Sequence, residues 1–164
     1  MPPARAPGGT VLRVLVVVLG LMTAIGPLSL DMYLPAFPEI AADLGVSPAE
    51  VQVSLTACLV GLALGQLLFG PLSDRWGRRR PAVIGVAAYA VLSLLIALSP
   101  TAPVLVTLRF LQGLAGGVGV VVARAVVRDR YSGVAAAKFF SRLTLIFGVA
   151  PIAAPALGSA VLTL

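Results

Sequence analysis

Residues 70–80 read Gly-Pro-Leu-Ser-Asp-Arg-Trp-Gly-Arg-Arg-Arg, and this charged run lies between two long apolar stretches. Val51–Ser73 before it and Pro81–Leu108 after it contain no charged residue. A helix of about 20 apolar residues crosses the roughly 30 Å hydrocarbon core of a membrane. Each stretch is therefore long enough to span a membrane, and the charged run is expected to be a short loop between two spans.

The composition excludes an ordinary soluble domain. The chain is 59% hydrophobic and 11% charged, with a mean hydropathy of +1.05, whereas soluble domains carry about 25% charged residues. A net charge of +6 would suit a nucleic-acid-binding protein, but the arginines flank apolar stretches and do not alternate with aromatic residues on one face. The single cysteine, Cys58, lies inside an apolar run and has no second cysteine for an internal disulfide.

The pattern predicts an all-α polytopic membrane protein with five spans. Pro35 and Pro38 are expected to end the first span, and Ser47 with Pro48 to cap and start the second. The expected segments are a tail over residues 1–10 and spans over about 11–34, 49–72, 81–99, 103–127 and 139–164. Residues 1–26 also fit a secretory signal peptide, but their small-residue cleavage pattern is weak, so a retained helix is favoured.

The basic residues predict the orientation of these spans. Lys and Arg next to a span stay on the cytoplasmic side of the cytoplasmic membrane. In the five-span arrangement every basic cluster falls on one side, in the tail and in the connections after the second and fourth spans. The other side carries only acidic charges: Glu39, Asp43 and Glu50. The N-terminus is therefore expected in the cytoplasm.

Two charged residues fall inside the predicted membrane region. Charges there are costly and usually face the bundle interior or a watery cavity. Asp31 lies one turn before Pro35, where it could bind protons or attract a cationic substrate, or could only cap the helix at the outer interface. Arg109 lies about two turns into the fourth span; it could polarise a carboxylate or hold an anion, or could extend to the outer surface.

Glycines and prolines are spaced for close helix contacts and for helix distortion. Gly61 and Gly65 in the second span and Gly113 and Gly117 in the fourth are four residues apart, which lets helix backbones approach in lipid. The fifth span contains two prolines between two glycines, which predicts a bent or locally open helix; it fits either a gate or an irregularity of packing. These residues are Gly148, Pro151, Pro155 and Gly158.

The sequence contains no catalytic constellation. It has no histidine, no cluster of metal ligands, no phosphate-binding loop of the Walker type and no nucleophile elbow. We therefore expect no enzyme activity, cofactor or metal. Energy for transport would come from an ion gradient or from another subunit.

These motifs together resemble the major facilitator superfamily. The loop resembles the signature between helices two and three, with its matched positions at Gly70, Asp74, Arg75, Gly77, Arg78 and Arg79. Residues 109–113 resemble the helix-four motif, whose arginine is implicated in proton coupling; Gln112 and Gly113, with Gly117, are expected to pack this helix against its neighbours. Residues 31–38 and 124–129 resemble the drug:proton antiporter branch, and within it the Bcr/CflA drug-resistance transporters. Residues 148–158 resemble the helix-five antiporter motif, although Ala154 and Ser159 replace expected glycines.

The resemblance implies a mechanism. Family members have twelve helices in two bundles that rock about a central site. Asp74 is expected to contact a helix N-terminus of the other bundle, Gly77 to permit the turn, and Arg78 to pair with Asp129. Asp31 and Arg109 would couple proton entry to the exit of a drug-like substrate. The partners implied are lipid, protons, a small molecule and the missing second bundle.

The chain stops before a sixth helix, so we expect a fragment, a frameshifted product or an incomplete gene model. The leading interpretation is the N-terminal part of a proton-coupled drug antiporter. One alternative is a metabolite or sugar transporter of the same superfamily. Another is a non-transporting membrane subunit that pairs with a separate half.

Overall fold

The computed structural model describes residues 9–163 as a bundle of long helices. The chain order is α1 (Gly9–Asp31), the 3-10 turn η1 (Leu34–Ala36), α2 (Phe37–Leu44), α3 (Pro48–Trp76), α4 (Arg79–Ala97), α5 (Ala102–Arg130) and α6 (Gly133–Leu162). Of the predicted tail, residues 1–8 lie outside the described part, and Gly9 and Thr10 already belong to α1.

Within residues 9–163, five helical segments are long and apolar enough to cross a membrane, in agreement with the predicted all-α polytopic class. They begin and end where the local chemistry favours it. Ser47 caps α3 with a reciprocal capping box to Glu50, and Pro48 occupies the first turn, as the sequence predicted. The helix α1 ends at Asp31, before the prolines. The sequence did not predict α2, whose first turn contains Pro38 and whose end is a left-handed Gly45 with φ of 63°.

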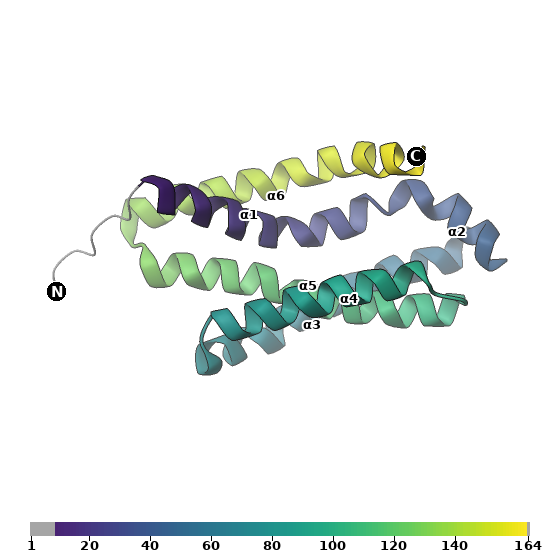
Figure 1. The fold of residues 1–164 in the computed structure, drawn as a ribbon, viewed down its shortest axis with the longest axis horizontal. Helices are drawn as coiled ribbons and strands as arrows, with labels where there is room; N and C mark the ends of the chain where they lie inside the picture. The colour runs from purple at the N-terminus through teal and green to yellow at the C-terminus, as the bar shows by residue number, and fades with distance from the viewer. Residues whose placement is uncertain (1–8, 164) are drawn as a thin grey trace.

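Successive long helices run in opposite directions, so every second connection between them lies at the same end of the bundle. The start of α1, the α3–α4 connection and the α5–α6 connection lie at one end, and α2 and the α4–α5 connection lie at the other (Figure 1). The arginines of the charged loop therefore lie at the same end of the bundle as Arg128 and Arg130 in the last turn of α5. This is the end that the charge pattern assigns to the cytoplasm.

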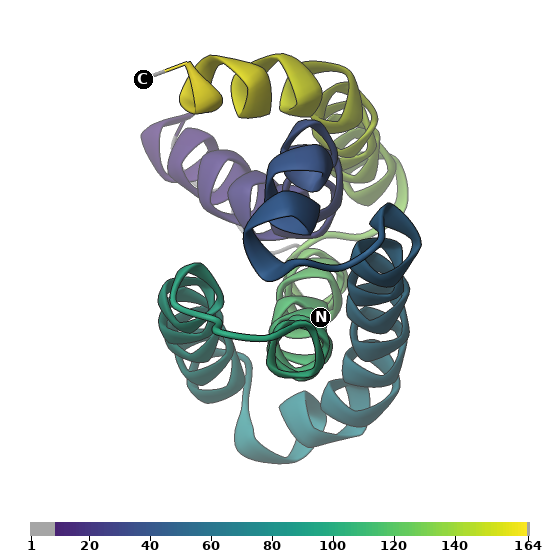
Figure 2. The ribbon, with the colours of Figure 1, turned by 90° about the vertical axis from the view of Figure 1, so that its right-hand side faces the viewer.

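The helix α5 is the centre of the bundle. Figure 2 shows α3 and α4 flanking α5 on opposite sides, with α1 and α6 above it, and α5 contacts all four. It is by far the most buried of the long helices, whereas the others expose most of their apolar side chains. Leu94, Leu98 and Ile152 are 70–78% exposed, which is expected where the neighbour is lipid and not water.

Glycines set the closest contact, between α3 and α5. A side chain at Gly113 would collide with the Cys58 carbonyl of α3, and one at Gly61 would collide with the Phe110 carbonyl of α5. Gly65 and Gly117 face the opposite backbone in the same way. The two helices thus pack backbone against backbone, which only glycine permits at these four positions.

Candidate functional site

Arg109 is buried in the first part of α5, in the half of the bundle nearer to α2. Its side chain is 6% exposed, so it does not extend to the surface. Nη1 donates to the backbone carbonyl of Ser29 at 3.1 Å and to Oε1 of Gln112 at 3.0 Å, and the guanidinium carbon lies 3.5 Å from the centre of the Tyr33 ring. Its Nε has no hydrogen-bond partner among the described residues. The charge is held by a carbonyl, an amide oxygen and an aromatic face, and not by a carboxylate.

Gln112 extends this contact to α4. Its Nε2 donates to Oγ of Ser93 at 2.8 Å, while its amide oxygen accepts from Arg109. The sequence analysis placed Gln112 in a helix-packing motif, but in the structure both ends of its amide form hydrogen bonds. Ser29 and Tyr89 add a second link between α1 and α4 through their hydroxyl groups. A polar network therefore joins α1, α4 and α5 inside an apolar bundle, where unsatisfied polar groups would be costly.

Asp31 does not join this network. It is half-buried, and within residues 9–163 it forms no ion pair or hydrogen bond through its side chain, to Arg109 or to any other group. It lines a cavity of about 270 Å³ between α1, α3, α5 and α6, together with Gln66 and Arg124. The remaining lining residues are apolar or glycine: Gly26, Pro27, Leu30, Leu59, Leu62, Val120, Phe147 and Pro151.

Arg109 of α5 nevertheless contacts residues that are close in sequence to Asp31. Arg109 contacts Ser29 and Tyr33, which lie two residues before and two residues after Asp31. The arginine therefore contacts the backbone before the carboxylate and an aromatic ring after it, without touching the carboxylate itself.

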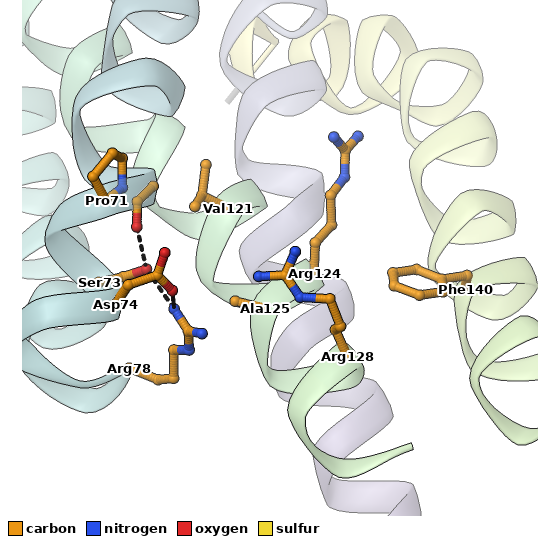
Figure 3. Close-up of a pocket in the computed structure, with 10 residues that line it drawn as sticks. Pro71, Ser73, Asp74, Arg78, Val121, Arg124, Ala125, Arg128 and Phe140 are labelled. Carbon is orange, nitrogen blue, oxygen red and sulfur yellow. Dashed lines mark hydrogen bonds and ion pairs between the residues drawn. The ribbon is translucent and has the colours of Figure 1, made fainter. Parts of the chain in front are cut away.

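The charged loop forms a compact cluster at the end of the bundle that carries the basic clusters. Arg78 donates from Nε to Asp129 at 2.8 Å and from Nη2 at 3.3 Å, which is a two-point contact between the loop and the end of α5. Its Nη1 donates to Asp74 at 2.5 Å and to Ser73 at 2.8 Å (Figure 3). The hydrogen bond with Asp129 is the main cause that raises the pKa of Arg78 above its ordinary value.

The geometry of Gly77 explains the sharp turn after α3. Its φ of 78° and ψ of 164° lie in a region that residues with a side chain rarely adopt. The turn brings Arg78 back beside Asp74, one helical turn earlier in the chain. Asp74 itself remains 57% exposed, while Arg75 and Arg79 are exposed and form no ion pair among the described residues.

Asp74 and Arg78 also line an open cavity of about 430 Å³ between α3, α5 and α6. Arg124 and Arg128 enter this space from α5, and Phe140 closes it from α6 (Figure 3). Neither of these two arginines makes an ion pair or a hydrogen bond within the described part of the chain.

The prolines of α6 lie within one continuous helix. Pro151 lines the Asp31 cavity, and Pro155 follows one turn later. Gly158 lies against the carbonyl of Met32, the residue after α1, where a side chain would collide. Gly148 has no neighbouring atom within 4 Å of the position a side chain would take. The four motif residues thus have different surroundings, and only Gly158 permits a close helix contact.

Comparisons with known proteins agree with this arrangement. A sequence profile described as Major Facilitator Superfamily matches residues 19–164. The chain is 51% identical over 158 residues to the protein named "Uncharacterized MFS-type transporter YdgK" of Bacillus subtilis (strain 168), covering 96% of this chain and 39% of that protein.

Two further relatives have names that refer to resistance. The chain is 39% identical over 145 residues to a bicyclomycin resistance protein homolog of Haemophilus influenzae, covering 88% of the chain and 36% of that protein. It is also 39% identical over 132 residues to the multidrug resistance protein MdtL of Escherichia coli (strain K12 / DH10B), covering 80% and 34%. The chain spans less than two fifths of the length of each relative.

Proposed function

The chain belongs to the major facilitator superfamily, and on that premise we propose that it acts as the N-terminal part of a proton-coupled antiporter. The proposed antiporter exports drug-like small molecules across the cytoplasmic membrane by alternating access, with the N-terminus of the chain in the cytoplasm. The resistance proteins among the relatives support export of toxic compounds. The gathering of basic residues at one end of the bundle supports the orientation.

The observation that carries the proposal is the position of Asp31. Its carboxylate lies in a cavity inside a membrane helix bundle and has no cationic partner within 4 Å among residues 9–163. A carboxylate in this position can be neutralised either by a proton or by a cationic group of a substrate. Binding one then excludes the other, which is the requirement for exchanging a substrate against a proton.

Arg109 acts in this proposal as a positioning residue. It contacts Ser29 in α1 and Tyr33 just after α1, and would in this way hold the chain on both sides of Asp31 in place. Its charge is permanent, and the side chain, 6% exposed, also lines a cavity of about 290 Å³ beside α2.

The cluster of Asp74, Arg78 and Asp129 acts as a brace at the cytoplasmic end. It ties the α3–α4 connection to the end of α5 through the two-point contact of Arg78. Asp74 keeps an exposed carboxylate that a helix N-terminus of a second bundle could bind. In one of the two access states this contact would hold the bundles together.

The proposal is tested with everted membrane vesicles that contain the protein at its native length. An imposed proton gradient should drive uptake of the fluorescent cation ethidium, and Asp31→Asn should abolish this uptake. Glu39→Gln is the matched control, because Glu39 is an exposed carboxylate on α2 that lines none of the cavities described above. Uptake that survives in Asp31→Asn would contradict the proposal.

A further inference from the structure

Arg124 lies where three cavities meet. It lines the open cavity beside Asp74, of about 430 Å³, and the Asp31 cavity, of about 270 Å³. It also lines a third space of about 150 Å³ between α1 and α6, next to Thr23 and Thr144. No other described residue lines all three. The Arg124 side chain therefore borders both the cavity at the loop end of the bundle and the cavity of Asp31.

The direction of the Arg124 side chain argues against a merely structural role. A long basic side chain near the end of a membrane helix normally extends toward the nearer surface. Figure 3 shows that Arg124 extends away from Arg78 and from the end of α5, toward the middle of the bundle. It forms no ion pair or hydrogen bond there among residues 9–163. The side chain thus presents a permanent positive charge to the cavity.

The lining of the Asp31 cavity then defines the chemistry of a ligand. Asp31 is its only acidic residue and Arg124 its only basic residue among the described lining. Gln66 adds a neutral hydrogen-bonding group, and the rest of the wall is apolar. When Asp31 is ionised the two charges balance, so a ligand with one charge of each sign is complementary to both. A permanent cation would be attracted by Asp31 but repelled by Arg124.

We propose that Arg124 is a specificity-determining residue, and that the cavity it shares with Asp31 takes amphipathic zwitterions. The cationic group of the ligand faces Asp31 and its carboxylate faces Arg124, while its apolar body lies against the leucines and Phe147. An arginine is suited to this task because its planar group binds a carboxylate at two points. The inference rests on the proposed transport function and adds the class of substrate to it.

The test compares two probes in proteoliposomes that contain the protein at its native length. Norfloxacin carries both a carboxylate and an amine, whereas ethidium is a permanent cation without an acidic group. Arg124→Gln should lower proton-driven norfloxacin transport at least about tenfold, because each charge-assisted hydrogen bond of the two-point contact contributes about that factor. Ethidium transport should stay the same or rise. Arg124→Lys should retain part of the norfloxacin transport because it keeps the charge but not the planar geometry.

Arg142→Gln is the matched control, because Arg142 is an exposed arginine of α6 that lines none of these three cavities. It should change the transport of neither probe. If Arg124→Gln alters both probes equally or alters neither, the inference is overturned while the transport function stands. The same holds if the wild-type protein moves ethidium but not norfloxacin. If the wild-type protein moves neither probe, the proposed function and this inference fail together.

Discussion

A single methyl group at Gly113 should separate α5 from α3. The added carbon would lie 2.9 Å from both the Cys58 carbonyl carbon and the Leu62 nitrogen, and closer still to the Cys58 oxygen. Ordinary contacts begin at 3.4 Å, so the two helices would have to move apart by at least about 0.5 Å. All three atoms belong to the backbone of α3, and a rotamer change cannot relieve the collision.

The magnitude follows from two opposing effects. Overpacking of a close contact costs about 1–3 kcal/mol, and alanine in place of glycine in a helix returns about 0.5–1 kcal/mol. Gly61, Gly65 and Gly117 depend on the same close approach of α3 and α5, so the overpacking cost should lie near the upper end of its range. We expect Gly113→Ala to lower the free energy of unfolding by about 2 kcal/mol. For a chain of this size that lowers the melting temperature by about 4–8 °C.

The assay is thermal unfolding of the intact protein in detergent micelles, followed by the helical circular dichroism signal. Gly148→Ala is the control, because a side chain at this helical position meets no atom within 4 Å. It should raise the melting temperature slightly or leave it unchanged. The reasoning is refuted if both variants melt with the wild-type protein, or if Gly148→Ala is destabilised as much as Gly113→Ala.

Three further predictions concern the charged residues and the loop. Arg109→Gln should abolish transport yet leave the melting temperature unchanged or higher, because it removes a buried charge that has no carboxylate partner; a fall of more than about 5 °C would instead mark the guanidinium as structural. A double-mutant cycle with Arg78→Ala and Asp129→Ala should give a coupling free energy of about 1 kcal/mol in denaturant unfolding, and additive effects would show that the contact does not stabilise the fold. Gly77→Ala should lower the free energy of unfolding by about 1–3 kcal/mol, because alanine is strained at φ of 78°. A variant whose denaturant midpoint equals that of the wild-type protein would contradict the observed turn.

The helix content was predictable because hydropathy and charge are properties of the chain alone. The uncharged stretches beside the loop are long enough to span a membrane, and the capping residues Ser47 and Pro48 mark the start of α3. The short helix α2 was not predicted, since Pro38 was interpreted as a stop signal. Proline also fits the first turn of a helix, where its missing N–H is not needed, and there it starts α2.

The details of the candidate site depend on how each helix is rotated about its own axis relative to its neighbours, which the sequence does not specify. Asp31 and Arg109 were expected to act together, but Asp31 faces one cavity while Arg109 contacts the polar network of α4. Gln112 belongs to that network because its side of α5 faces Ser93. Arg124 belonged to a recognised motif, yet only the packing of four helices shows that it lines the cavity of Asp31.

The central claim is that one carboxylate, Asp31, binds either a proton or the substrate. The most direct test is to add ethidium to the purified protein at its native length in weakly buffered detergent solution and to record released protons with a pH indicator. The account predicts release of up to about one proton per protein from the wild type and none from Asp31→Asn. Equal release from both proteins would contradict it, as would ethidium binding to the wild type that releases no proton at any pH.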